Sequence, residues 1–207
     1  TQNLVGSGCW ESRDSGLSDF GRDVVDQMND LGILVDLSHV GDTTSSDAIA
    51  HSKKPVAYTH CFPNAIMDHP RNKSDEMLKK IADKGGFVGV VAYTPFMPKG
   101  DDSTVEDVLD GYEHMFNIVG EDHVGIGTDF TQGQSVEFFQ YLRSDKGFGR
   151  LLSAPMAKRP DNPKGLDGPS EYANLTEAMM KRGWSEKRIR KVLGENWLAF
   201  LEEVWGS

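Results

Sequence analysis

Two stretches of the sequence share one plan: "ILVDLSHVGD" at residues 33–42 and "PVAYTHCFPN" at residues 55–64. In each, a short apolar run is followed by a hydroxyl residue and then a histidine, which is His39 in the first stretch and His60 in the second. Short apolar runs alternating with helical segments are typical of buried strands in a parallel sheet. The two runs therefore predict two strands, at residues 33–37 and 55–59.

The rest of the chain continues this alternation. Apolar runs predict two further strands, at 87–94 and 123–129. Helical periodicity and capping residues predict helices at 18–31, 42–52, 74–86, 103–120, 170–183 and 185–205. The order predicts an α/β protein with a parallel sheet, either an open doubly wound sheet or part of a (β/α)8 barrel. A complete barrel needs about 250 residues and eight strands, so four strands would be about half of one.

Composition limits the classes of function. The 207 residues predict a single domain spanning 1–207. The formal net charge of −10 argues against nucleic acid as a partner, because phosphates would be repelled. Cys9 and Cys61 are too few for a disulfide scaffold, so we expect two free thiols and a cytoplasmic protein. The start at Thr1, in the polar stretch "TQNLVGSGC", indicates a processed or truncated amino terminus.

Chemistry-bearing residues fall at the predicted carboxyl ends of strands. His39 and His60 follow or end the first two strands, and Asp129 ends the fourth. In parallel α/β folds these ends meet at one edge of the sheet, where functional residues gather. Neutral imidazoles held there suit a transition metal, usually zinc. The alternative is that both histidines are hydrogen-bonded structural residues.

The loop "HPRNKSD" (69–75) is the other dense stretch. Arg71 could hold a substrate carboxylate through a two-pronged salt bridge, or it could pair with Asp68 or Asp75. His69 could touch substrate from the same loop. The other histidines are interpreted as structural: His51, His114 and His123.

Longer segments resemble a known family. They include "GLSDFGRDVVDQMNDLGILVDLSHV", "THCFPNAIMDHPRNKSDEMLKKIADKGGFVGVVAYTPF", "EDHVGIGTDF" and "NLTEAMMKRGWSEKRIRKVLGENWLAFLEEVW". Together they resemble the membrane (renal) dipeptidases, a family of zinc dipeptidases, and its bacterial members in particular. The resemblance covers essentially the whole chain.

The resemblance implies the second half of a (β/α)8 barrel, with carboxyl-terminal helices and a two-zinc centre that hydrolyses dipeptides. It makes His39 and His60 ligands of one zinc ion. It makes Arg71 the residue that binds the substrate's terminal carboxylate. It places Asp129 beside the attacking water and the substrate amine, as a catalytic and substrate-binding residue.

The family's early His-x-Asp motif, its metal-bridging glutamate and a histidine that stabilises the oxyanion have no counterpart in the sequence given. We therefore expect this chain alone to be inactive, and to need the amino-terminal half of the barrel or a second chain. Open sheet edges predict a homo-oligomer. A related metal-dependent amidohydrolase or lactonase, or an inactive truncated interaction protein, is the alternative. Family members occur both anchored to membranes and free in bacteria, so a periplasmic or membrane-associated location is open as well.

Overall fold

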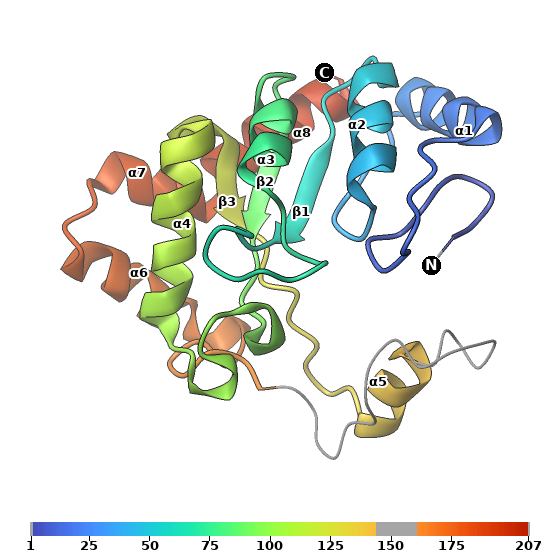
Figure 1. Cartoon of the computed structure of the whole chain (residues 1–207). Coiled ribbons are helices and arrows are strands. Elements are labelled where there is room, and N and C mark those ends of the chain that lie inside the picture. The colour runs from blue at the N-terminus through green and yellow to red at the C-terminus, as the bar shows by residue number, and fades with distance from the viewer. Residues whose placement is uncertain (1, 144–160, 207) are drawn as a thin grey trace.

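The computed structural model describes residues 2–143 and 161–206. Helices and strands alternate through the first part of the chain, and helices close it (Figure 1). The elements are α1 (Asp19–Asp30), α2 (Asp42–His51), β1 (Ala57–Cys61), α3 (Asp75–Ala82), β2 (Phe87–Val90), α4 (Val105–Val119), β3 (Val124–Ile126), α5 (Val136–Arg143), α6 (Tyr172–Lys181), α7 (Glu186–Arg190) and α8 (Asn196–Trp205).

The three strands form one parallel sheet in the order β1-β2-β3. Helix α3 connects β1 to β2, and α4 connects β2 to β3, so each connection is a β-α-β crossover. The strands expected at 55–59, 87–94 and 123–129 are therefore present, although each is shifted or shorter than expected. An α/β protein with a parallel sheet is confirmed.

The prediction of a strand at residues 33–37 is wrong. Only one bridge forms there, between Asp36 and Ala57. Ala57 donates to the Val35 carbonyl at 3.1 Å and accepts from the Leu37 amide at 2.8 Å. Beyond this point the Asp36 carboxylate accepts from the amides of Ser38 and Thr59, at 3.0 and 3.2 Å. The Asp36 side chain thus accepts hydrogen bonds from amides that would pair with main-chain carbonyls if the strand ladder continued.

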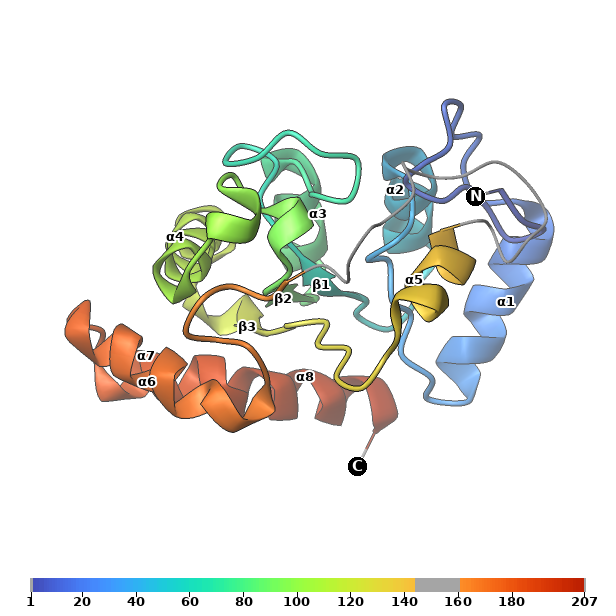
Figure 2. The same cartoon turned by 90° about the horizontal axis from the view of Figure 1, so that it is seen from below.

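The sheet is open in the described part of the chain, and a closed barrel is not formed there. Helices α3 and α4 cover one face, where Leu78 and Leu109 are fully buried. Helix α8 lies against the other face, as Figure 2 shows, with Phe200 and Val204 packed on the first residues of β1 and β2. In the described residues these helices cover the faces of the sheet and not the carboxyl ends of its strands (Figure 1).

Serine residues begin several helices, as the sequence predicts. The Ser18 hydroxyl caps α1 by accepting from the Gly21 amide, and Ser185 caps α7 in the same way. The single helix expected at 185–205 is interrupted by a π-helical turn at Lys191–Glu195, which separates α7 from α8. Across the described residues, no helix combines the length and the apolar character needed to cross a bilayer.

Candidate functional site

The two histidines that follow hydroxyl residues meet at the carboxyl edge of the sheet. His60 lies near the end of β1, and His39 lies in the turn after the Asp36 bridge. Their Nε2 atoms are 3.0 Å apart, and their ring centroids are 5.0 Å apart. The parallel pairing of residues 36 and 57 brings them together, because it aligns the chain segments that lead to each ring.

Asp129 lies three residues beyond β3, on the same edge. Its Oδ2 atom is 3.9 Å from His60 Nε2. Among the residues that the structure places, Asp129 is the one non-glycine residue with a positive φ, at 59°. Aspartate tolerates this left-handed conformation better than most residues, and such conformations cluster at functional sites. Asp129 thus combines an unusual backbone conformation with a carboxylate close to the histidine pair.

The surroundings keep both imidazoles neutral. Desolvation, followed by the positive charge of Arg71, lowers the pKa of His39 to about 3. Desolvation also lowers the pKa of His60, and Arg71 adds to the effect, while the Asp129 carboxylate opposes it. Neutral imidazoles keep a lone pair on one ring nitrogen, which is the form that binds a metal ion.

Arg71 lies beneath the histidine pair and is only 1% exposed. Its Nη2 donates to the carbonyl of His60 at 2.9 Å, and its Nη1 donates to the carbonyl of Ser38. Its guanidinium also lies 5.2 Å from the centre of the Phe96 ring. Arg71 therefore clamps the two main-chain segments that carry the histidines.

The alternative partners of Arg71 have other contacts. Asp68 accepts from the side-chain amide of Asn64 at 3.3 Å, and Asp75 pairs with His114 at 2.7 Å. His123 bonds the carbonyl of Gly86 at 2.9 Å, so both of these histidines have the structural contacts that the sequence suggested. The two cysteines are free, as expected, and Cys61 is buried.

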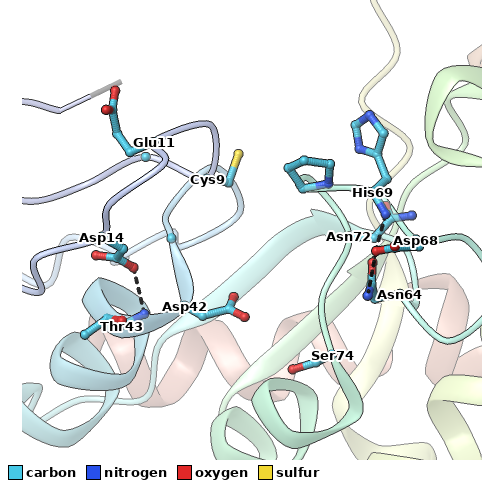
Figure 3. Close-up of a pocket in the computed structure, with 13 residues that line it drawn as sticks. Cys9, Glu11, Asp14, Asp42, Thr43, Asn64, Asp68, His69, Asn72 and Ser74 are labelled. Atoms are coloured by element: carbon cyan, nitrogen blue, oxygen red, sulfur yellow. Dashed lines mark hydrogen bonds between the residues drawn. The ribbon is translucent and has the colours of Figure 1, made fainter.

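A cavity of about 480 Å³ lies beside this site. Figure 3 shows Cys9, Glu11, Asp14 and Asp42 on one wall, and His69, Asn72 and Asn64 on the other. The residues expected to form the site do not line it, with the exception of His69. The cavity nevertheless adjoins the site, because the Cys9 amide donates to the His39 carbonyl at 2.8 Å.

The described side chains do not form a complete metal site. They contain no group of three or more His, Cys, Asp or Glu residues placed to hold one ion. Two imidazole nitrogens bound tetrahedrally to one zinc ion at about 2.0–2.1 Å lie about 3.3–3.4 Å apart, so the 3.0 Å between the His39 and His60 nitrogens is slightly shorter than this geometry. Zinc sites use three or four protein ligands, so two histidines alone are too few.

Comparison with known proteins decides the family. The family model of the membrane dipeptidases, peptidase family M19, matches residues 2–146 and 155–205. The chain belongs to the membrane dipeptidase family. This family comprises metallo-dipeptidases, and the resemblance carried by the sequence motifs is confirmed.

Individual relatives of the family are longer than this chain. Dipeptidase tcpJ of Claviceps purpurea is 32% identical over 191 residues, which are 91% of this chain and 39% of the relative. An amidohydrolase structure from Pseudomonas aeruginosa is 55% identical with a TM-score of 0.95, and matches 100% of this chain and 63% of its own. A metallopeptidase from Rhodobacter sphaeroides, liganded with a phosphinate mimic of the dipeptide L-Ala-D-Ala, is 29% identical with a TM-score of 0.75 and coverages of 98% and 50%. The chain therefore spans between about two fifths and two thirds of the length of these relatives.

Proposed function

We propose that this chain is the carboxyl-terminal part of a (β/α)8 barrel that hydrolyses dipeptides with the help of zinc. One observation carries the proposal: two neutral histidines of a metallo-dipeptidase family present their Nε2 atoms 3.0 Å apart at the carboxyl edge of a parallel sheet. Active sites of (β/α)8 enzymes lie at this edge.

In this proposal His39 and His60 hold one zinc ion through their Nε2 atoms. The remaining ligands of a two-zinc centre come from the part of the barrel that this chain does not span, since the chain covers at most 63% of the relatives described above. Bound zinc supplies polarisation of the peptide carbonyl and a water of lowered pKa. The two histidines would hold the zinc ion at the carboxyl edge of the sheet.

Asp129 acts on the substrate. Its side chain is 37% exposed and lies next to the histidine pair, so a substrate can reach it. Its carboxylate binds the free α-amino group of the dipeptide or carries a proton toward the leaving amine.

Arg71 contributes in two ways. Its hydrogen bonds orient the segments of Ser38 and His60, and its positive charge attracts the terminal carboxylate of a dipeptide. Because Arg71 is only 1% exposed, it attracts the carboxylate at a distance from the protein interior, without direct contact.

The second candidate is an amidohydrolase that acts on cyclic amides or lactones. It is favoured by the relative that is 55% identical, which is described as an amidohydrolase. Such substrates have no free carboxylate, so they gain nothing from the charge of Arg71. Replacing Arg71 with methionine removes its hydrogen bonds to the histidine segments and should weaken both reactions, but it should weaken dipeptide hydrolysis more, because only dipeptides also lose the attraction of a carboxylate, if the first candidate is right.

The test combines this chain with the amino-terminal portion of the Pseudomonas aeruginosa relative, adds zinc, and measures hydrolysis of dipeptides and lactones together with bound zinc. We expect His39→Ala and His60→Ala to lose zinc and activity, whereas His123→Gln, away from the site, keeps both. Asp129→Asn should keep zinc and lose about 10²–10⁴-fold in rate, as expected for a lost proton-transfer group. Dipeptide hydrolysis by the chain alone, or unchanged zinc content in His39→Ala, would contradict the proposal.

A further inference from the structure

The carboxylate of Asp36, which is not one of the proposed ligands, accepts hydrogen bonds from the residues that precede both histidines. Asp36 Oδ1 accepts hydrogen bonds from the Ser38 amide at 3.0 Å, the Ser38 hydroxyl at 2.6 Å and the Thr59 amide at 3.2 Å. Asp36 Oδ2 accepts from the Thr59 hydroxyl at 2.7 Å. The Thr59 hydroxyl oxygen also lies 2.8 Å from Nδ1 of His60. Asp36, Thr59 and His60 thus form one hydrogen-bonded chain.

The direction of each bond in this chain follows from proton counting. An ionised carboxylate has no proton to donate, so the single hydroxyl proton of Thr59 goes to Asp36. The Ser38 hydroxyl also gives its proton to Asp36, and therefore has none for the Thr59 oxygen 3.2 Å away. The proton between Thr59 and His60 must then belong to the ring, on Nδ1. A neutral imidazole has one ring proton, so Nε2 of His60 keeps its lone pair.

We infer that Asp36 is a positioning residue which, through the Thr59 hydroxyl, holds His60 in the Nδ1–H tautomer and aims the free Nε2 lone pair at the metal position. The value of this arrangement for catalysis rests on the proposed function, but the tautomer itself does not. Partners of this kind behind a metal-binding histidine commonly change metal affinity 10–100-fold when they are replaced.

The geometry predicts that Asp36→Asn reverses the direction of the hydrogen bonds between residue 36, Thr59 and His60. Two main-chain amides donate to the Oδ1 position, so the oxygen of an asparagine must stay there. Its NH₂ group then occupies the Oδ2 position and donates to Thr59. The Thr59 hydroxyl proton turns to Nδ1 of His60, and the ring proton moves to Nε2. An exchange of Asp for Asn behind a catalytic histidine is known to give the wrong tautomer in this way.

The test measures the tautomer of His60 in the metal-free chain by long-range ¹H–¹⁵N correlation of the imidazole rings, and measures zinc affinity separately by calorimetry on the chain combined with the amino-terminal portion of the Pseudomonas aeruginosa relative. We expect Nδ1–H in the unmodified chain and in Thr59→Ser, which keeps the hydroxyl. We expect Nε2–H in Asp36→Asn and a mixture of tautomers in Thr59→Val, which removes the hydroxyl but keeps the shape. Zinc binding should weaken 10–100-fold in the last two variants.

Asp14→Asn serves as the matched control, because the Asp14 carboxylate also accepts main-chain and hydroxyl hydrogen bonds but none of its bonds leads to a histidine. It should leave the His60 tautomer unchanged. An Nε2–H tautomer in the unmodified chain would overturn the inference even if every variant fails to fold. So would an unchanged tautomer in both Asp36→Asn and Thr59→Val. If the tautomers change as expected but the chain combined with the amino-terminal portion binds no zinc, the proposed function fails and the positioning role of Asp36 stands.

Discussion

At the residue scale, the histidine pair owes its chemistry to desolvation and to the cation below it. Arg71 lies in the interior, no carboxylate of the described residues forms an ion pair with it, and its charge acts on both rings. The surroundings favour the charged form of the Asp36 carboxyl, whereas they favour the neutral form of the two imidazoles. Although desolvation works against ionisation, hydrogen bonds from Ser38 and Thr59 hold the pKa of its carboxyl below the usual value. The site therefore combines neutral imidazoles with an ionised carboxylate.

The lowered pKa of His39 predicts a loss of stability in acid. The unfolded chain protonates this ring as pH falls through about 6.5, whereas the folded chain resists protonation down to about 3. The free energy of unfolding should therefore be unaffected by His39 above pH 7 and should fall as pH decreases below 6.5. Urea unfolding of the metal-free chain at pH 7.5 and pH 5 checks this. His39→Gln cannot titrate and should show a smaller difference between the two pH values; an equal or larger difference would refute the expectation.

At the element scale, α2 is capped by a residue that is far away in sequence. The N-cap position is Gly41, which has no side chain to offer. Instead, the Asp14 carboxylate accepts from the amides of Thr43 and Thr44, at 2.7 and 3.0 Å. A Cβ at residue 41 would lie 2.5 Å from the Asp14 oxygen, so glycine permits this close approach. The amino-terminal loop is thereby fastened to the helix that follows His39.

Removing this cap should destabilise the fold. Asp14→Ala leaves amides of the first turn of α2 without an acceptor, which typically costs about 1–2 kcal/mol of unfolding free energy. Urea unfolding measures the loss. Asp23→Ala, at an exposed position on α1, should change stability by less than about 0.5 kcal/mol. Equal effects of the two substitutions would show that Asp14 does not act as a cap.

At the scale of the whole molecule, the open sheet and the apolar surface near its first edge are unusual for an isolated protein. Leu31 and Ile33, which lead into the Asp36 bridge, are 70% and 48% exposed, and Trp205 at the end of α8 is 64% exposed. These residues are close in space, because a Cβ at Gly32 would lie 3.4 Å from the Trp205 backbone. Exposed apolar surface next to an unpaired strand edge favours association.

This surface supports the prediction that the chain forms a homo-oligomer. We expect light scattering after size exclusion to show a mass that rises with protein concentration. Charged substitutions at Leu31 and Ile33 should shift the equilibrium toward the monomer, while the same change at Leu198, which is 62% exposed on another part of α8, should have less effect. A monomer at every concentration would show that the edge does not pair.

Local patterns in the sequence were sufficient for much of the fold. Capping serines, glycine stops and short β-branched runs predict α1, α3, α4 and the parallel strands, because these signals act within a few residues. The order of apolar runs predicted that His39 and His60 meet, although the segment before His39 forms a single bridge and not the strand that the prediction assumed. The motifs also identified the family.

Interactions between distant residues decided the rest. The sequence shows a hydroxyl before each histidine, but only the folded chain shows that Asp36 fixes the direction of those hydrogen bonds. Burial of Arg71 and the capping of α2 by Asp14 likewise depend on segments about 30 residues apart. Gly127 of "GIGTDF" is explained by its close approach to the Thr59 carbonyl, where a Cβ would lie 2.1 Å away, and Gly125 by the Phe87 ring, which a Cβ would meet at 2.6 Å. Composition and periodicity record local preferences, whereas proton direction, burial and close approach exist only once the segments have packed.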